Sequence, residues 1–370
     1  MGYSVNDKIR LLIVDDSVFF RQALVSALKN DIRVEVVGQA VDAMDAMEKI
    51  KALKPDVVTL DVEMPKLNGI DFLKKLMPVH PVPVVVVSSA PVRVLDALSA
   101  GAVEFIRKPE IKGPDGMKKF MAELSTKIRI AANAKVSKRF TAPAAAPAAA
   151  PAPRPAAGGS GNPLSGGPGL VLNRVIDENI VIAIGASTGG TEAILEVVQH
   201  LPAATPGIVI VQHMPPVFTR MYAQRLDRIC NMRVKEAEDG DRVEKGKIII
   251  GAGEYHLRLA KDSKGWFVHS EKGPKVSGHC PSVDVLFDSV ASAAGPHAMG
   301  IILTGMGADG AAGLLKMRKA GAYTVGQDKE TCVVYGMPMV AFNNGAVKVQ
   351  MALQDMDKEI VRYLNTRKPL

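Results

Sequence analysis

Residues 9–17 read IRLLIVDDS, an apolar run of strand length that ends in two aspartates and a serine. Such a run is typical of a parallel strand that is buried on both faces of its sheet. Similar apolar runs follow at residues 34–37, 57–60, 82–87 and 103–106. Segments with the spacing of amphipathic helices separate these runs. Five such repeats predict an open parallel sheet with helices on both faces.

The second half of the chain repeats this alternation of apolar runs and helical segments. Strands are predicted at residues 180–184, 208–211, 247–250, 300–303 and 322–325. Helical spacing follows Thr191 and Phe218, and residues 265–278 have the composition of a hairpin. The pattern predicts a second and larger α/β domain, which also contains a parallel sheet.

Residues 141–169 separate the two halves and differ from both in composition. Of these 29 residues, 10 are Ala, 7 are Pro and 6 are Gly, so they offer no side chains for a core. We therefore expect two doubly wound α/β domains, at residues 8–130 and 178–366. Residues 131–177 are expected to form a flexible linker rich in Ala, Pro and Gly.

The composition excludes several classes of protein. The 370 residues are 47 % apolar, and the net charge of +8 divides into +2, +3 and +3 for residues 1–130, 131–178 and 179–370. No basic cluster points to a nucleic-acid partner. Three scattered cysteines exclude a disulfide framework and a structural zinc site. Without a signal-peptide core or an apolar run of about 18 residues, we expect a cytoplasmic protein that is not inserted in a membrane.

Polar side chains follow the predicted strands of the first half where each strand ends. They are Asp15 and Asp16, Asp61, Ser88, and Lys108. Because parallel strands end at the same edge of their sheet, we expect these groups to converge. Carboxylates are ligands for a hard divalent cation, and a lysine beside a hydroxyl can bind phosphoryl oxygens.

Four motifs of the first half resemble the receiver domain of two-component response regulators, which has a flavodoxin-like fold. They are VDDS (14–17), LDVEMPKLNG (60–69), VSS (87–89) and RKP (107–109). The resemblance implies that a histidine kinase is the phosphoryl donor and that Asp61 is the phospho-acceptor. It also implies that Asp15, Asp16 and Asp61 hold Mg²⁺, together with the backbone carbonyl of Glu63.

The same resemblance assigns the remaining receiver residues. Lys108 is expected to pair with the phosphate, through a cis peptide bond to Pro109, and Ser88 is expected to hydrogen-bond a phosphate oxygen. Phe105 stands where these domains carry an aromatic residue that changes position on phosphorylation.

The second half contains a candidate nucleophile in GASTGG, residues 185–190, between a predicted strand and a predicted helix. This segment matches G-x-S-x-G, the turn that presents a serine at the edge of a sheet. A glycine-rich turn before a helix also binds phosphate groups, and that alternative stays open here. The segment lacks the Gly-x-Gly-x-x-Gly pattern and the Lys-Ser/Thr of a P-loop.

A nucleophilic serine needs a base and a group that orients the base. His213 and Asp309 both follow predicted strands of the same sheet as Ser187, so the three side chains can converge. His256 and His279 also lie in glycine-containing loops, and the sequence pattern leaves them as rival bases.

Four motifs of this half resemble the catalytic domain of chemotaxis protein-glutamate methylesterases. They are GASTGG (185–190), VQHMPP (211–216), HCPSVD (279–284) and TGMGADG (304–310). The resemblance implies that Ser187 is the nucleophile, His213 the base and Asp309 its orienting group, with the Met306 N–H in the oxyanion hole. The implied reaction hydrolyses glutamate methyl esters on chemoreceptors to methanol, needs no cofactor, and extends to deamidation of receptor glutamines. Cys280 stands where this family often has arginine, which leaves its substrate contacts undefined.

A receiver joined to a hydrolase predicts an esterase that is activated by phosphorylation. Two other functions remain to be tested. In the first, the second half is an inactive scaffold in a phosphorylation-dependent binding module. In the second, the chain regulates transcription, although no helix-turn-helix pattern is evident.

Overall fold

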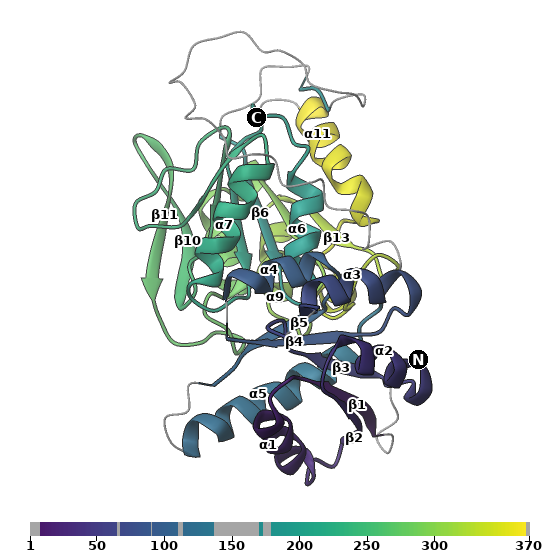
Figure 1. Ribbon diagram of the computed structural model, residues 1–370. Coiled ribbons are helices and arrows are strands. Elements are labelled where there is room, and N and C mark those ends of the chain that lie inside the picture. The colour runs from purple at the N-terminus through teal and green to yellow at the C-terminus, as the bar shows by residue number, and fades with distance from the viewer. Residues whose placement is uncertain are drawn as a thin grey trace.

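The computed structural model of the chain describes residues 8–64, 67–89, 91–109, 114–136, 170–172 and 179–367. It contains two α/β bodies that lie against each other (Figure 1). Most of the predicted linker, residues 137–169 and 173–177, lies outside the described residues. Among the described residues, none of the helices is long and apolar enough to cross a bilayer.

The first body is a parallel sheet of five strands in the order β2-β1-β3-β4-β5. The strands are β1 (Ile9–Val14), β2 (Val34–Ala40), β3 (Val57–Leu60), β4 (Val84–Ser88) and β5 (Glu104–Arg107). Side chains alternate between its two faces: Leu12 and Val14 face one apolar cluster, while Leu11 and Ile13 face another. This is the predicted fold with the flavodoxin-like strand order.

Five helices cover the two faces of this sheet. They are α1 (Val18–Leu28), α2 (Ala43–Leu53), α3 (Gly69–Val79), α4 (Pro91–Ser99) and α5 (Pro114–Ala132). Helices α1 and α5 pack on one face, and α2, α3 and α4 pack on the other. Ser17 is the N-cap of α1, since its hydroxyl accepts a hydrogen bond from the Phe20 N–H.

The second body is a parallel sheet of seven strands in the order β14-β13-β12-β6-β7-β9-β8. They are β6 (Val181–Ala186), β7 (Ile208–Gln212), β8 (Arg233–Glu236), β9 (Lys247–Ile250), β12 (Ala298–Ile302), β13 (Tyr323–Gln327) and β14 (Val349–Met351). An antiparallel hairpin, β10 (Tyr255–Asp262) with β11 (Gly265–Lys272), packs beside the sheet. The two doubly wound sheets confirm the predicted fold class.

The helices of the second body also divide between two faces. They are α6 (Gly190–Val198), α7 (Phe218–Ile229), α8 (Val283–Ala293), α9 (Ala311–Lys319), α10 (Met337–Asn343) and α11 (Met356–Thr366). Helices α6, α7 and α11 cover one face, and α8, α9 and α10 cover the other.

One apolar cluster continues from the first body into the second. It joins the side chains under α2, α3 and α4 to those under α6, α7 and α11. Helix α4 contacts both α6 and α7, as Figure 1 shows. The two bodies therefore share a packed apolar interface.

The predicted domain bounds remain a prediction, but parts of the expected linker pack against the folded bodies. Helix α5 ends at Ala132, and the Lys135 N–H donates to the Val333 carbonyl at 2.8 Å. Leu170 and Leu172 pack against the shared apolar cluster. These short segments therefore differ from a flexible linker.

Candidate functional site

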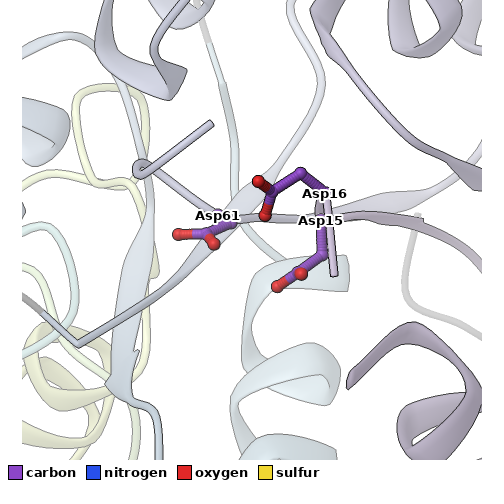
Figure 2. Close-up of side chains that lie close together, drawn as sticks. All are labelled: Asp15, Asp16 and Asp61. Atoms are coloured by element: carbon purple, nitrogen blue, oxygen red, sulfur yellow. The ribbon is translucent and has the colours of Figure 1, made fainter. Parts of the chain in front are cut away.

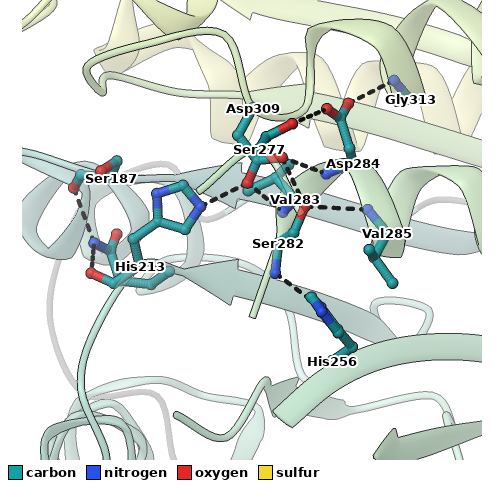
Figure 3. Close-up of polar contacts among 11 residues, drawn as sticks. Ser187, His213, His256, Ser277, Ser282, Val283, Asp284, Val285, Asp309 and Gly313 are labelled. Atoms are coloured by element: carbon teal, nitrogen blue, oxygen red, sulfur yellow. Dashed lines mark hydrogen bonds and ion pairs between the residues drawn. The ribbon is translucent and has the colours of Figure 1, made fainter. Parts of the chain in front are cut away.

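Ser187, His213 and Asp309 all lie at the carboxyl edge of the seven-stranded sheet. Ser187 follows β6, His213 follows β7 directly, and Asp309 lies in the loop after β12. Since β6 pairs with both β7 and β12, three adjacent strands bring these side chains together (Figure 3). The structure thus places the three residues as the strand-end pattern predicts.

The turn at Ser187 is held by backbone hydrogen bonds on several sides. The Ser187 N–H donates to the Thr304 carbonyl at 3.0 Å, and the Ser187 carbonyl accepts from the Gly190 N–H at 2.7 Å. The Gln212 side-chain amide donates to the same carbonyl at 2.9 Å. Gly189, the N-cap of α6, adopts a left-handed backbone conformation with φ +77°, which glycine allows without strain. The serine is therefore fixed on a sharp turn between strand and helix.

His213 is held at one ring nitrogen and is without a partner at the other. Its Nε2 lies 2.8 Å from Oδ2 of Asp309, and both side chains are buried. Its Nδ1 is buried and makes no hydrogen bond within the described part of the chain. Figure 3 shows Ser187 on the side of the ring away from Asp309. The unpartnered Nδ1 is thus on the side of the ring that faces Ser187, where a base that accepts the serine proton is needed.

Asp309 sits at the N-terminus of α8, which the strand-end reasoning did not predict. Its carboxylate accepts from the Ser282 hydroxyl at 2.7 Å and from the N–H groups of Val283 and Asp284 at 2.8 and 3.0 Å. Burial alone would raise the pKa of Asp309. The hydrogen bonds from His213, Asp284 and Ser282 outweigh burial and lower this pKa to about 2. Because the carboxylate stays ionised and can only accept, the proton on the His213 ring lies on Nε2.

Two glycines allow α8 to approach Asp309 so closely. A Cβ on Gly185 would lie 2.1 Å from Cγ1 of Val283, and one on Gly310 would lie 2.5 Å from the same atom. The side chain of Val283, the first residue of α8, therefore occupies the space that a Cβ at position 185 or 310 would need. The glycines beside the serine and the aspartate in the sequence are the signal for this close packing.

Met306 lies in the loop between β12 and Asp309, and its side chain is 46 % exposed. Next to it, a Cβ on Gly305 would lie 2.7 Å from Cβ of Ser187, so this backbone runs directly past the Ser187 side chain. Within the described residues, the Met306 N–H donates no hydrogen bond. This position suits the predicted oxyanion donor.

The two rival histidines have other roles in the structure. His256 is buried; its Nε2 lies 2.8 Å from the Pro274 carbonyl, and its Nδ1 accepts from the Ser282 N–H at 3.3 Å. Both of its nitrogens are thus used in holding the segment before α8. His279 stacks on the His213 ring with centroids 3.7 Å apart and planes 7° apart. Of the three candidate bases, His213 is the one bonded to Asp309.

A second group of side chains lies at the carboxyl edge of the five-stranded sheet (Figure 2). Asp15, Asp16 and Asp61 each offer a carboxylate oxygen within 4.8 Å of the others. The Lys108 ammonium lies 2.7 Å from Asp15 and 2.6 Å from Asp61. Burial lowers the pKa of Lys108, but its hydrogen bonds to both carboxylates outweigh this and raise the pKa. The strand ends converge as predicted.

The donor set suits a hard divalent cation. Burial raises the pKa of Asp15 and the repulsion from Asp61 adds to this, while Lys108, whose ammonium lies 2.7 Å from Oδ2 of Asp15, acts in the opposite direction. A divalent cation held here would offset the same repulsion between the carboxylates. The backbone of Glu63 lies next to this group, since the Glu63 N–H donates to Oδ1 of Asp61 at 2.9 Å. Among the described residues the cis peptide bond is at Cys280–Pro281 and not at Lys108–Pro109, so that expectation was wrong.

Ser88 and Phe105, the other two residues assigned by the receiver resemblance, lie on β4 and β5. Ser88 is buried at the end of β4, and its carbonyl accepts from the Lys108 N–H at 3.0 Å. Phe105 on β5 is 7 % exposed, and its ring centroid lies 4.6 Å from that of Phe218, the first residue of α7. The sequence reasoning did not foresee that Phe105 contacts the second body.

Comparisons with known proteins agree with both halves of this description. The sequence pattern of the family described as CheB methylesterase matches residues 182–360, and that of the response regulator receiver domain matches residues 11–118. The CheB methylesterase catalytic domain of Thermotoga maritima is 36 % identical, with a TM-score of 0.48 over 50 % of this chain and 97 % of that chain. The response regulator domain of Thermotoga maritima CheB is 42 % identical, with a TM-score of 0.32 over 35 % of this chain and 98 % of that one.

Two curated relatives match the chain over nearly its whole length. The protein-glutamate methylesterase/protein-glutamine glutaminase 2 of Syntrophomonas wolfei is 48 % identical over 97 % of this chain and 98 % of its own. The protein-glutamate methylesterase/protein-glutamine glutaminase of Salmonella typhimurium is 44 % identical over 97 % of both chains. The chain therefore belongs to the protein-glutamate methylesterase/protein-glutamine glutaminase family, with a receiver domain in front of a CheB methylesterase domain.

Proposed function

We propose that this protein is a cytoplasmic esterase that hydrolyses glutamate methyl esters on chemoreceptors and is activated by phosphorylation of Asp61. One observation carries the catalytic half of the proposal: Nε2 of His213 is held by a buried, ionised Asp309, while its Nδ1 is unpartnered on the side of Ser187. Together with the family, this arrangement supports a Ser-His-Asp mechanism.

The first half of the reaction forms an acyl-enzyme. The Ser187 hydroxyl oxygen attacks the ester carbonyl carbon, and Nδ1 of His213 takes the hydroxyl proton. The Met306 N–H stabilises the negative oxygen of the tetrahedral intermediate. This intermediate then breaks the bond to the methoxy oxygen, which receives the proton from His213 and leaves as methanol.

The second half regenerates the enzyme. A water molecule gives a proton to Nδ1 of His213 and attacks the acyl carbon. The bond to the Ser187 oxygen breaks, and that oxygen recovers the proton from His213. The product is a glutamate carboxylate. A glutamine side chain would follow the same steps, with ammonia as the leaving group after protonation by His213.

The receiver would be phosphorylated on Asp61 by a histidine kinase. Asp15, Asp16 and Asp61, with the Glu63 carbonyl, would hold Mg²⁺, which when bound offsets the negative charge of the phosphoryl group. Lys108, now paired with Asp15 and Asp61, is placed to pair with the phosphate instead.

Contacts between the two bodies support the regulatory half of the proposal. Oε1 of Glu104 accepts from the hydroxyl of Thr188, the neighbour of the nucleophile, at 3.2 Å. The Ser99 hydroxyl donates to Glu192 of α6 at 3.1 Å. Together with the tilted Phe105–Phe218 ring pair, these contacts connect β5 and α4 to the turn that carries Ser187 and to the first residues of α6 and α7. A rearrangement around Asp61 that moves Phe105 would therefore loosen this packing.

The experiment that tests this function measures methanol release from methylated receptor membranes, with and without acetyl phosphate, in wild type and in Asp61→Asn. We expect acetyl phosphate to stimulate the wild type and to leave Asp61→Asn unchanged, because the amide cannot accept a phosphoryl group. Equal stimulation of both proteins would contradict phosphorylation of Asp61 as the activating event.

The contact between Phe105 and Phe218 leads to a separate prediction. In Phe105→Ala the ring contact with Phe218 is lost, and the activity without acetyl phosphate is expected to rise by up to roughly tenfold, since an aromatic pair contributes about 0.5–1.5 kcal/mol. Phe105→Leu, which retains apolar volume, serves as the matched control and should give a smaller rise. Methanol release without phosphoryl donor is the measurement. Unchanged or lower activity in Phe105→Ala would contradict inhibition through this contact.

A further inference from the structure

His279 is prominent in the active site, yet the proposed reaction gives it no task. It stands in a tight backbone turn in which Val276 and His279 exchange N–H to carbonyl hydrogen bonds of 3.0 and 2.9 Å. The two residues between them, Ser277 and Gly278, have φ of +52° and +85°, as in a type I′ turn. The ring is therefore presented by a compact hairpin end rather than by an extended loop.

This turn is tied to the helix that holds Asp309. The Ser277 hydroxyl donates to Oδ2 of Asp284 at 3.1 Å, and Oδ1 of Asp284 accepts from the Gly313 N–H at 2.7 Å (Figure 3). Residues 276–284 thus supply both the ring on His213 and the hydrogen bonds to Asp309. The contacts to His213 and to Asp309 thus come from one continuous segment of the chain.

The stack restrains a motion that the hydrogen bond to Asp309 leaves open. A ring held at Nε2 alone can tilt about that contact, which moves Nδ1 relative to Ser187. The His279 ring, 3.7 Å away and within 7° of parallel, blocks tilting toward its side. Since the orientation of the base relative to the nucleophile determines proton transfer, this restraint bears directly on the rate.

The charge state of His279 suits this position. Burial and the neighbouring His213 lower the pKa of His279 to about 4, with Lys275 and Lys127 acting in the same direction and Asp309 against it. His279 is therefore neutral at neutral pH. A neutral ring places no like charge beside the imidazolium that forms when His213 takes the serine proton.

We propose that His279 is a positioning residue for the esterase reaction: its stacked ring holds the His213 ring in the orientation that directs Nδ1 to Ser187. This inference rests on the proposed function, in which His213 is the base. It assigns His279 no proton transfer of its own.

The kinetic test compares His279→Ala with His279→Phe in the full-length protein stimulated by acetyl phosphate. We expect His279→Ala to lower kcat by about 10- to 100-fold with KM little changed, because the reacting groups are misplaced rather than lost. His279→Phe keeps a flat ring and should recover most of the activity. His269→Ala, in which a partly exposed histidine of β11 is removed, is the matched control.

A second readout does not depend on ester hydrolysis. The proton on Nε2 of His213, donated to Asp309, should give a low-field NMR signal, identified by its loss in His213→Gln. We expect this signal to persist in His279→Phe and to broaden in His279→Ala, as the ring moves and its proton exchanges with water. An unchanged signal together with unchanged kcat in His279→Ala would overturn the proposal.

Failure of the proposed function would appear differently. Methanol release that is independent of Ser187 would reject the esterase mechanism, while the NMR comparison would still report whether His279 holds the His213 ring. A loss of kcat in His279→Ala that His279→Phe does not restore, with the NMR signal intact, would also overturn the positioning role.

Discussion

Replacing Ser187 by alanine is expected to abolish methanol release from methylated receptor membranes, with a loss on the order of 10⁶ in rate. The reason is chemical: the neighbouring hydroxyl, that of Thr188, donates to Glu104, and without the Ser187 oxygen no acyl-enzyme forms. The measurement is methanol release by fully phosphorylated protein, with prolonged incubation to quantify the residual rate.

Two controls make this experiment specific. Ser292→Ala removes an exposed serine on α8 and should leave the rate unchanged. Phosphorylation of Asp61 by acetyl phosphate should proceed normally in Ser187→Ala, which shows that the receiver is folded. A decrease smaller than about tenfold would reject Ser187 as the nucleophile.

Replacing Asp309 by asparagine is expected to lower kcat by about 10⁴ while KM changes little. The four donors around this side chain all require an acceptor: Nε2 of His213, the Ser282 hydroxyl and two backbone N–H groups. An amide supplies one acceptor atom and one donor group. If the amide N–H faces Nε2, the ring proton moves to Nδ1, and His213 can no longer accept the proton of Ser187.

Asp284→Asn is the matched control for this substitution. The Asp284 carboxylate lies beside Asp309 but bonds to Ser277 and Gly313, not to His213. Its backbone N–H, which does hold Asp309, is kept in the variant. We expect a loss of less than tenfold in Asp284→Asn. Equal losses in the two variants would indicate a general electrostatic or folding effect rather than orientation of His213.

The strand-end residues were predictable because the strands are buried on both faces. A β-branched apolar run defines a buried parallel strand, and the first polar residue after it marks the edge where ligands bind. This reasoning located Asp15, Asp61, Ser187 and His213 without any knowledge of their neighbours. The edge strands β8 and β14 were missed, since each is short and partly exposed and so has no continuous apolar run.

The environment of Asp309 could not be derived from the local sequence pattern. Helix α8 reaches Asp309 through packing against Gly185 and Gly310, which are distant in the sequence from Val283 and from each other. Only the small size of these glycines hinted at a close approach. The stack of His279 on His213 is likewise a long-range contact, and sequence reasoning left His279 as a rival base.

The contacts between the two bodies were the least predictable feature. Glu104 and Phe105 belong to an ordinary strand, and nothing in their spacing indicates that they face Thr188 and Phe218. Such contacts depend on how two separately folded surfaces fit, which a periodic pattern within one domain does not encode.

The continuous apolar cluster between the bodies also has a reciprocal consequence. If phosphate on Asp61 favours a form in which the catalytic body is released, then any molecule that binds only the released form must favour phosphorylation by the same factor. A methylated receptor segment that occupies the site of Ser187 would therefore act as an effector of the receiver as well as a substrate. The phosphorylation equilibrium of this protein would then report the methylation state of the receptors around it.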